Sequence, residues 1–230
     1  MLKKFEGLFM IYVTGDFHGE FEKFKSSGMK QLKKNDILIV CGDFGFLWDG
    51  GHAEKRLIKK IGRLPYKVLF VEGSHENYRA FDEYPETTVY GGRARIIYGN
   101  LVLLRRGNIY QIEGKKIFAF GGGMGEFLEN SEQTEGSIAR LPTEEDMKLA
   151  LKTIESCDGQ VDVVVTHDCP MLIRGSIIGN SEDMNHLHIF LQLISEKLSF
   201  RQWYFGCYHM DKQVSPTYRA VYDNVVRVNI

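Results

Sequence analysis

The chain contains little cysteine, and none of it is closely paired. Among 230 residues there are four cysteines, at positions 41, 157, 169 and 207. The sequence has neither a C-x-x-C pair nor a dense cysteine framework, which excludes a small domain held together by disulfide bonds. This usage is typical of a reducing, intracellular compartment and predicts a cytoplasmic protein.

Long apolar runs and an excess of one charge are also missing. No run approaches the roughly 20 residues of a membrane-spanning helix, so no membrane span is expected. Segment 1–9 lacks the apolar stretch of a signal peptide and is expected to be a short N-terminal extension. Lysine and arginine (29) nearly balance aspartate and glutamate (30), so charge does not indicate nucleic acid as a partner.

What the chain does contain is ordinary for a globular protein. Hydrophobic residues make up 43% and charged residues 26% of the sequence. Its 230 residues suit one domain, 1–230, with a substantial buried core. No pattern in the sequence indicates an oligomeric state.

Six short apolar runs alternate with helical patterns along the chain. The runs are mostly continuous, which suits strands covered on both faces. They are Ile11–Thr14, Ile37–Cys41, Val68–Val71, Ile117–Phe120, Val161–Thr166 and Trp203–Phe205. Apolar residues recur at helical spacing within 53–61, 147–154 and 187–198, and Thr143 with Asp146 resembles a capping box.

Hairpin strands are expected in the middle and at the end of the chain. Their segments are Leu101–Leu104, Ile109–Ile112, Tyr218–Tyr222 and Val225–Val228, with turns at Glu113-Gly114 and Asp223-Asn224. An early β–α alternation followed by hairpins favours an α/β fold with two sheets in a sandwich over a single doubly wound sheet. The Gly-rich and then acidic stretch 121–142 is expected to be a long loop near the site.

Residue types that bind metal ions follow five of the predicted strands. The blocks are Asp16-Phe17-His18, Gly42-Asp43-Phe44-Gly45, Gly73-Ser74-His75-Glu76, Thr166-His167-Asp168 and Gly206-Cys207-Tyr208-His209. Donors at strand ends can converge at one edge of a sheet, as a metal site requires. Each block alone is weak, because Asp and Gly also mark turns. Turns do not explain why four of the seven histidines, 18, 75, 167 and 209, fall in these blocks.

The order of the blocks resembles the calcineurin-like metallophosphoesterase superfamily, and the match looks closest to its small bacterial or phage-type members. The family pattern is D-x-H, G-D-x-G, G-N-H-[E/D], [T/G]-H and G-H-x-H. Three blocks match without change, but Ser74 stands where the family has Asn and Cys207 where it has the first His of the last block. The resemblance covers nearly the whole chain and implies a two-sheet sandwich flanked by helices, in four layers, α/β/β/α.

The resemblance also implies two sets of metal ligands. One metal would be held by Asp16, His18, Asp43 and His209, a complete set. The other would be held by Asp43, Ser74, His167 and Cys207, so both departures fall on one site. The implied cofactors are one or two divalent ions, Mn, Fe or Zn.

The altered set leaves several alternatives open. A serine hydroxyl is a poorer ligand than an asparagine amide, so Ser74 is expected to lose a direct bond or to act through water. A Cys207 thiolate would favour zinc, and Cys169 is a further candidate ligand nearby. The alternatives are a small buried Cys207 with no second metal, or a disulfide between Cys169 and Cys207.

By the same resemblance, the chain is expected to hydrolyse phosphomonoesters or phosphodiesters through a metal-activated hydroxide. His75 would protonate the leaving oxygen as general acid. Arg79 is a candidate phosphate contact, although a surface salt bridge also explains it. The competing hypothesis is a binding or scaffold protein that keeps the fold without catalysis. The substrate is not indicated.

Two further features have an ordinary explanation and a functional one. The glycines at 121–123 and 125 suggest a phosphate loop, but no Lys-Ser/Thr follows them, which favours a tight loop beside the metal site. Phe44, Phe46 and Trp48 could stack on an aromatic group of a substrate, but core packing is the default expectation for such residues.

Overall fold

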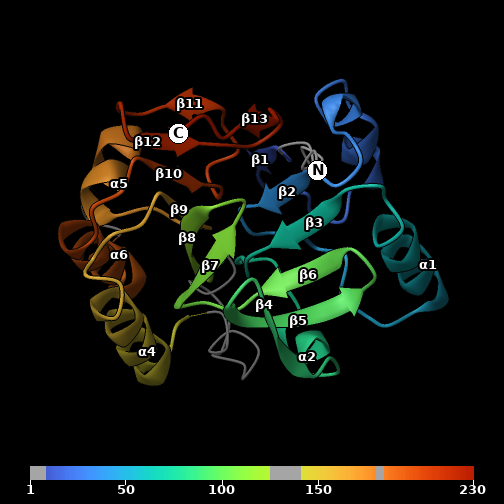
Figure 1. The fold of residues 1–230 in the computed structure, drawn as a ribbon, viewed down its shortest axis with the longest axis horizontal. Helices are drawn as coiled ribbons and strands as arrows, with labels where there is room; N and C mark the ends of the chain where they lie inside the picture. Colours follow the sequence, from blue (N-terminus) through green and yellow to red (C-terminus); the bar gives the residue numbers. More distant parts are fainter. Residues whose placement is uncertain (1–8, 125–140, 180–183) are drawn as a thin grey trace, which may run out of the picture.

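Two mixed β-sheets face each other in the computed structural model, with helices on the outer face of each (Figure 1). The structure describes residues 9–124, 141–179 and 184–230. Most of the predicted N-terminal extension and of the predicted loop 121–142 therefore lies outside the described residues. The expected two-sheet α/β sandwich flanked by helices is confirmed.

The first sheet has seven strands, of which the central four run parallel. Its order is β13 (Val226–Arg227), β1 (Ile11–Thr14), β2 (Ile37–Val40), β3 (Lys67–Phe70), β6 (Leu101–Leu104), β5 (Gly92–Tyr98) and β4 (Glu86–Val89). Parallel pairing of β1 with β2 and of β2 with β3 brings the carboxyl ends of these three strands to one edge.

The second sheet has six strands, and β8, β9, β10 and β12 run parallel. Its order is β11 (Lys212–Gln213), β12 (Tyr218–Ala220), β10 (Gln202–Phe205), β9 (Val163–Thr166), β8 (Lys115–Phe120) and β7 (Asn108–Ile112). The predicted hairpin turn at Glu113-Gly114 is confirmed, because β7 and β8 pair antiparallel across it.

Helices cover the outer faces in two groups (Figure 1). The first sheet is covered by α1 (His52–Ile61), α2 (Tyr78–Phe81) and the 3-10 helices η1 (Phe21–Lys25) and η2 (Met29–Gln31). The second is covered by α4 (Glu144–Glu155), α5 (Met171–Ile178) and α6 (His186–Lys197). The predicted capping box of α4 is present, because Thr143 Oγ1 accepts from the Asp146 backbone and Asp146 accepts in return.

The continuous apolar strands are explained by burial on both faces. Along β2, Ile37 and Ile39 pack between the two sheets, whereas Leu38 and Val40 pack under the helices. In β9, Val164 packs under the helices of the second sheet while its neighbours face the first sheet. Alternate side chains thus enter two different cores, so no polar face is needed.

The predicted terminal hairpin is wrong. Segments 218–222 and 225–228 do not pair with each other, because β12 joins the second sheet beside β10 and β13 joins the first beside β1. The chain crosses between the sheets at Asp223-Asn224, where Asp211 accepts hydrogen bonds from the backbone N–H groups of 222–224. The strand sequences were recognisable, but their partners are set by tertiary packing.

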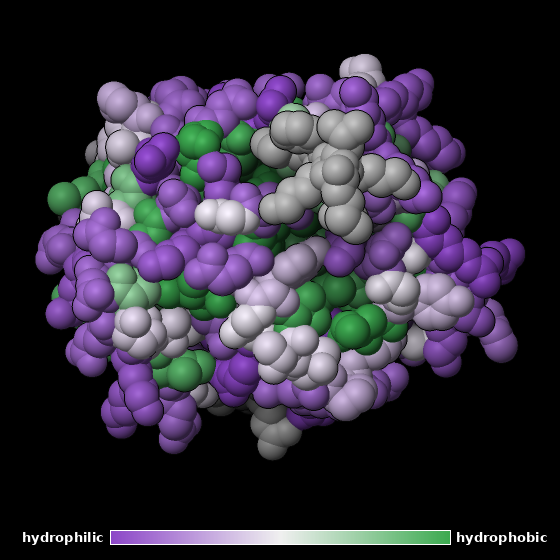
Figure 2. Space-filling model, viewed as in Figure 1, coloured by the Kyte–Doolittle hydropathy of each residue, from purple (hydrophilic) through white to green (hydrophobic). Residues whose placement is uncertain are grey.

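The surface seen in Figure 2 is mostly hydrophilic, with hydrophobic residues in separate groups. Among the helices of the described residues, none is long and apolar enough to cross a membrane.

Candidate metal centre

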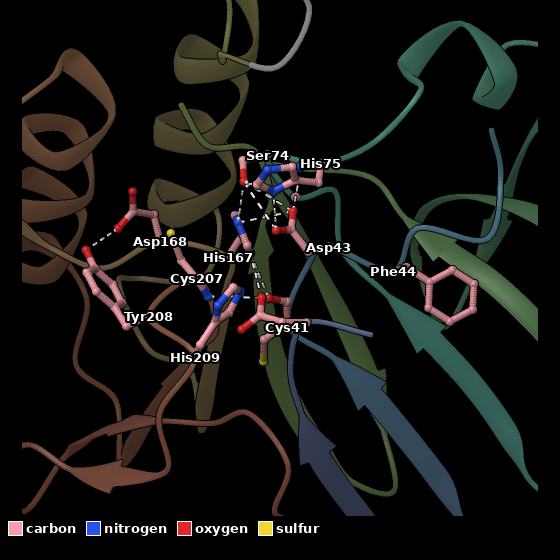
Figure 3. Close-up of polar contacts among 12 residues, drawn as sticks. Cys41, Asp43, Phe44, Ser74, His75, His167, Asp168, Cys207, Tyr208 and His209 are labelled. Atoms are coloured by element: carbon pink, nitrogen blue, oxygen red, sulfur yellow. Dashed lines mark hydrogen bonds and ion pairs between the residues drawn. The ribbon is translucent and has the colours of Figure 1, made fainter. Parts of the chain in front are cut away.

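The five ligand blocks meet where the carboxyl edges of the two sheets face each other. Asp16, Asp43 and Ser74 follow β1, β2 and β3, and His167 and His209 follow β9 and β10. Figure 3 shows Ser74, His75 and His167 gathered around Asp43, while Phe44 points away from the group. The strand-end residues predicted to converge therefore lie in one cluster, built from both sheets.

Left-handed backbone conformations mark this cluster. Asp16, His18, Asp43, Cys207 and His209 have φ values of 47, 48, 46, 70 and 45°. A non-glycine residue in this region costs on the order of 1 kcal/mol or more, and such strain concentrates at functional sites. All five residues lie in the ligand blocks that follow the ends of strands.

The first predicted ligand set is brought together. One donor atom each from Asp16, His18 and His209 lies within 4.8 Å of the others. The Nε2 atoms of His18 and His209 are 2.9 Å apart, and Asp43 Oδ2 lies 3.9 Å from His18 Nε2. Asp16 Oδ2 is buried and has no hydrogen-bond partner among the described residues. Facing imidazole nitrogens beside an unsatisfied carboxylate oxygen are a donor set that fits a divalent cation.

The second predicted set is only partly assembled. His167 Nε2 lies 3.3 Å from Asp43 Oδ1 and 3.2 Å from Ser74 Oγ, and Ser74 Oγ lies 3.3 Å from both Asp43 carboxylate oxygens. Cys207 donates its backbone N–H to Asp16 at 3.0 Å, and its thiol interacts with His167. The compact groups of donor atoms found among the described residues include His167 and Asp43 but not the Cys207 sulfur.

Cys169 does not add a ligand to this set. Its thiol is buried and donates to the Tyr208 hydroxyl at 3.3 Å. Cys169 is also absent from the compact donor groups of the described residues. All four cysteines are free thiols, so Cys169 and Cys207 form no disulfide.

His75 lies against the carboxylate that both sets share. Its Nδ1 is 2.9 Å from Asp43 Oδ2, and its backbone N–H donates to Asp43 Oδ1 at 2.7 Å. The His75 side chain is 38% exposed, whereas that of His167 is completely buried. His75 is therefore held by Asp43 on one side while still open to solvent, as a group that exchanges a proton with a substrate must be.

Burial and mutual charge shift the pKa values of the central groups. Burial alone would raise the pKa of Asp43, but His167 and His75 outweigh it and hold that pKa below its usual range. Burial raises the pKa of Asp16 to about 7, even though His167 opposes the shift. Burial alone would lower the pKa of His167, but Asp43, Cys207 and Asp16 raise it well above its ordinary value.

Metal binding is therefore expected to release protons. At pH 6, Asp16 and His167 both carry protons because both pKa values are raised, and a metal needs the deprotonated forms. The affinity for Zn²⁺ or Mn²⁺ should rise between pH 6 and pH 8, by up to about tenfold per pH unit for each proton released. Calorimetry in two buffers of different ionisation enthalpy counts these protons, and an affinity independent of pH would contradict the assignment.

Gly123 explains how the segment after β8 passes so close to the cluster. A Cβ atom at Gly123 would lie 2.8 Å from His167 Cδ2 and 3.2 Å from Ser74 Cβ. Only a residue without a side chain lets the backbone pass here. Gly123 thus lies beside the candidate metal centre, while residue 125 is outside the described residues.

Comparison with known proteins agrees with this geometry. A family model for calcineurin-like phosphoesterases matches residues 9–212. The chain belongs to the calcineurin-like phosphoesterase family. No curated protein matches it.

Two solved structures resemble this chain. One, provisionally named a 5'-nucleotidase from Staphylococcus aureus and solved with alpha-ketoglutarate, is 17% identical with a TM-score of 0.50, over 95% of this chain and 50% of that chain. The chain thus spans about half the length of that protein, and the likeness shows the fold. The other, phosphopantetheinyl hydrolase from Mycobacterium tuberculosis, is 15% identical with a TM-score of 0.47, over 93% of this chain and 89% of that chain.

Glu76 is a functional neighbour to which the sequence assigned no role. Its buried carboxylate accepts the backbone N–H groups of Phe44 at 2.7 Å and Gly45 at 3.1 Å. Burial raises its pKa to about 8. Glu76 therefore links the block that contains His75 to the loop that carries Asp43. Its position directly after His75 was the available signal.

A second buried network supports the loop that carries Cys207 and His209. Asp168 accepts hydrogen bonds from the Tyr208 hydroxyl at 2.6 Å, from His188 Nε2 at 2.8 Å and from the Cys169 backbone at 2.8 Å. Burial alone would raise the pKa of Asp168, but these bonds hold it below its usual range. The sequence analysis gave His188 no role, and its place on the buried face of α6 was the available signal.

Arg79 and the aromatic residues after Asp43 occupy different surroundings. Phe44 and Phe46 are buried in the core beneath the first sheet, as the default interpretation predicted. Trp48 is 51% exposed and lines a cavity with Arg79. The contact of Arg79 with phosphate stays a prediction.

Proposed function

We propose that this protein hydrolyses phosphomonoesters or phosphodiesters with one or two bound divalent metal ions, Mn, Fe or Zn. The observation that carries the proposal is the convergence of Asp16, His18, Asp43 and His209 around an unsatisfied buried carboxylate oxygen. Structural polar clusters normally satisfy their own buried atoms, whereas this one leaves Asp16 Oδ2 without a partner among the described residues.

The residues of the cluster would have separate roles in metal binding and proton donation. Asp16, His18 and His209 would hold one ion, His167 would contribute to a second, and Asp43 would contact both because its two oxygens face different imidazoles. Bound ions would supply positive charge for the phosphoryl group and a water of lowered pKa. His75 would donate its proton to the leaving oxygen, and Asp43 at Nδ1 would orient its ring.

The second ion would be bound more weakly or would be a different metal. Ser74 offers a hydroxyl that interacts with Asp43 and His167 instead of an amide oxygen, and burial raises the pKa of the Cys207 thiol to about 11. A metal at this site must displace that proton to gain a thiolate, a ligand that favours zinc over manganese.

Restoring the family residues at both positions tests this asymmetry. The double variant Ser74→Asn, Cys207→His is expected to bind the second Mn²⁺ at least about tenfold more tightly and to hydrolyse bis-p-nitrophenyl phosphate faster, because two better ligands replace a hydroxyl and a thiol. Cys207→Ser is the matched control, since it removes the sulfur without adding an imidazole. If metal stoichiometry and hydrolysis rate both stay unchanged in the double variant, Ser74 and Cys207 do not limit metal binding or hydrolysis.

The proposed function itself is tested by metal analysis of the purified protein together with phosphoester hydrolysis. We expect bound divalent metal and hydrolysis of p-nitrophenyl phosphate or its bis ester in added Mn²⁺ or Zn²⁺. Absence of metal and of turnover in every condition would favour a binding or scaffold protein instead.

A further inference from the structure

A small cavity lies between the loop that follows Asp43 and the segment that follows His75. Its volume is about 160 Å³, and its lining includes Trp48, Asn77 and Arg79. Asn77 is two residues after His75, and two residues span at most about 7 Å of extended chain. The lining of the cavity therefore comes within two residues of His75, the residue that would protonate the leaving group.

Trp48 in this cavity is exposed although its backbone is fixed. Its N–H donates to Glu54 Oε2 at 2.7 Å, and its carbonyl accepts a hydrogen bond from Asn77 Nδ2. The side chain is nevertheless 51% exposed, unlike the nearby Phe44 and Phe46, which are buried. An indole held in place at the backbone with its ring open to solvent is arranged to contact a ligand rather than to fill a core.

The size and charge of the cavity restrict what it can accept. A cavity of about 150 Å³ holds benzene, so this one has room for a single planar ring. The ionisable residues in its lining carry a formal charge of −1, because three carboxylates outnumber two cations: Asp49, Glu54, Glu83, Lys55 and Arg79. A net negative lining does not favour a second phosphate, but it accepts an uncharged ring with polar edges.

We propose that this cavity receives a single planar ring of the substrate's leaving group, stacked on Trp48, while the phosphate lies at the metal centre. The inference rests on the proposed function and narrows its substrate class to esters whose leaving group carries one ring, such as aryl phosphates or pyrimidine nucleotides. Asn77 connects the two parts of the site, because it follows His75 in the chain and binds the Trp48 carbonyl.

The tryptophan content of the chain allows a direct binding test without catalysis. Trp48 and Trp203 are its only tryptophans, and Trp203 is completely buried. In chelated, metal-free protein, phenyl phosphate is expected to change tryptophan emission saturably, whereas butyl phosphate, which has the same phosphate but no ring, is not. Equal responses to both compounds, or no response to phenyl phosphate both in the chelated protein and after Zn²⁺ is added back, would overturn the proposal.

Substitutions then assign the contact to Trp48. By calorimetry, Trp48→Ala is expected to bind phenyl phosphate roughly 5- to 150-fold more weakly, the range for losing one stacked ring, and Trp48→Phe should recover most of the affinity. Leu172→Ala is the matched control, because Leu172 is 65% exposed but lies outside the cavity. If Trp48→Ala binds phenyl phosphate as tightly as the unchanged protein, the stacking site is wrong.

The outcomes also separate this inference from the proposed function. Ring binding by the metal-free protein, with no hydrolysis of any ester after metal is added, contradicts the phosphoesterase proposal and leaves the ring site standing. Hydrolysis of phenyl and butyl phosphate with equal kcat/KM, unaffected by Trp48→Ala, contradicts the ring site and leaves the phosphoesterase standing.

Discussion

Asp43→Asn is expected to abolish most metal binding and to lower phosphoester hydrolysis by about a thousandfold or more. The Asp43 carboxylate belongs to two of the compact donor groups of the described residues and contacts His75 and His167 directly. Replacing it with a neutral amide removes the charge shared by both ions, and the charge stabilisation that such ions supply is worth several kcal/mol. Metal content and kcat for bis-p-nitrophenyl phosphate, measured on the same preparation, check this result.

Asparagine is the suitable replacement because Asp43 has a left-handed backbone, with φ of 46°. Asparagine tolerates that region, so the variant is expected to fold. Asp158→Asn is the matched control, since Asp158 is also left-handed, with φ of 53°, and exposed. Without metal, both variants should unfold cooperatively, and Asp43→Asn should unfold at a lower temperature because it also weakens the buried contacts of Asp43 with His75 and His167. If Asp43→Asn has normal metal content and a normal rate of hydrolysis, Asp43 is not a metal ligand.

The second large effect is expected at His75. His75→Ala should lower kcat for an alkyl phosphate by about 10² to 10⁴, the usual contribution of a general acid. The loss should be much smaller for a p-nitrophenyl ester, whose leaving group departs without protonation. Metal content should stay close to that of the unchanged protein, because the role given to His75 is proton donation rather than ligation.

Comparing the two leaving groups is necessary because the structure also allows His75 to be a metal ligand. Donor atoms of His18, Asp43 and His75 also lie within 4.8 Å of one another, so His75 is near enough to bind a metal itself. A ligand role predicts the same fold loss for both leaving groups, together with lower metal content. That result would identify His75 as a metal ligand instead of a general acid. The pH profile adds a second readout, because loss of a general acid removes the fall in kcat at high pH.

Much of the fold and of the site follows from the sequence because both depend on local signals. The apolar runs that form β1, β2, β9 and β10 differ from the observed strands by only a residue or two at their ends. Parallel neighbours then place Asp16 and Asp43 at one edge of the first sheet, and His167 and His209 at one edge of the second. Convergence within each sheet could therefore be predicted without coordinates, whereas the meeting of the two edges depends on how the sheets pack.

What the sequence did not reveal depends on packing between distant segments. The β4–β5 hairpin was missed because the side chains of β4 are largely exposed and give little apolar signal. Phe44, Phe46 and Trp48 form one aromatic series, and only the structure shows that the first two are buried and Trp48 is not. The position of Cys207 likewise depends on a left-handed backbone, with φ of 70°, that no local pattern specifies.

The central claim is that catalysis requires metal held by Asp16, His18, Asp43 and His209. The most direct test is to remove metal with a chelator and then add Mn²⁺ or Zn²⁺ stepwise, following bound metal and bis-p-nitrophenyl phosphate hydrolysis together. We predict that hydrolysis disappears with the metal and returns as the first ion binds, with any further rise at higher metal concentration. Full activity in the chelated protein, or no activity at any metal concentration, would contradict the claim.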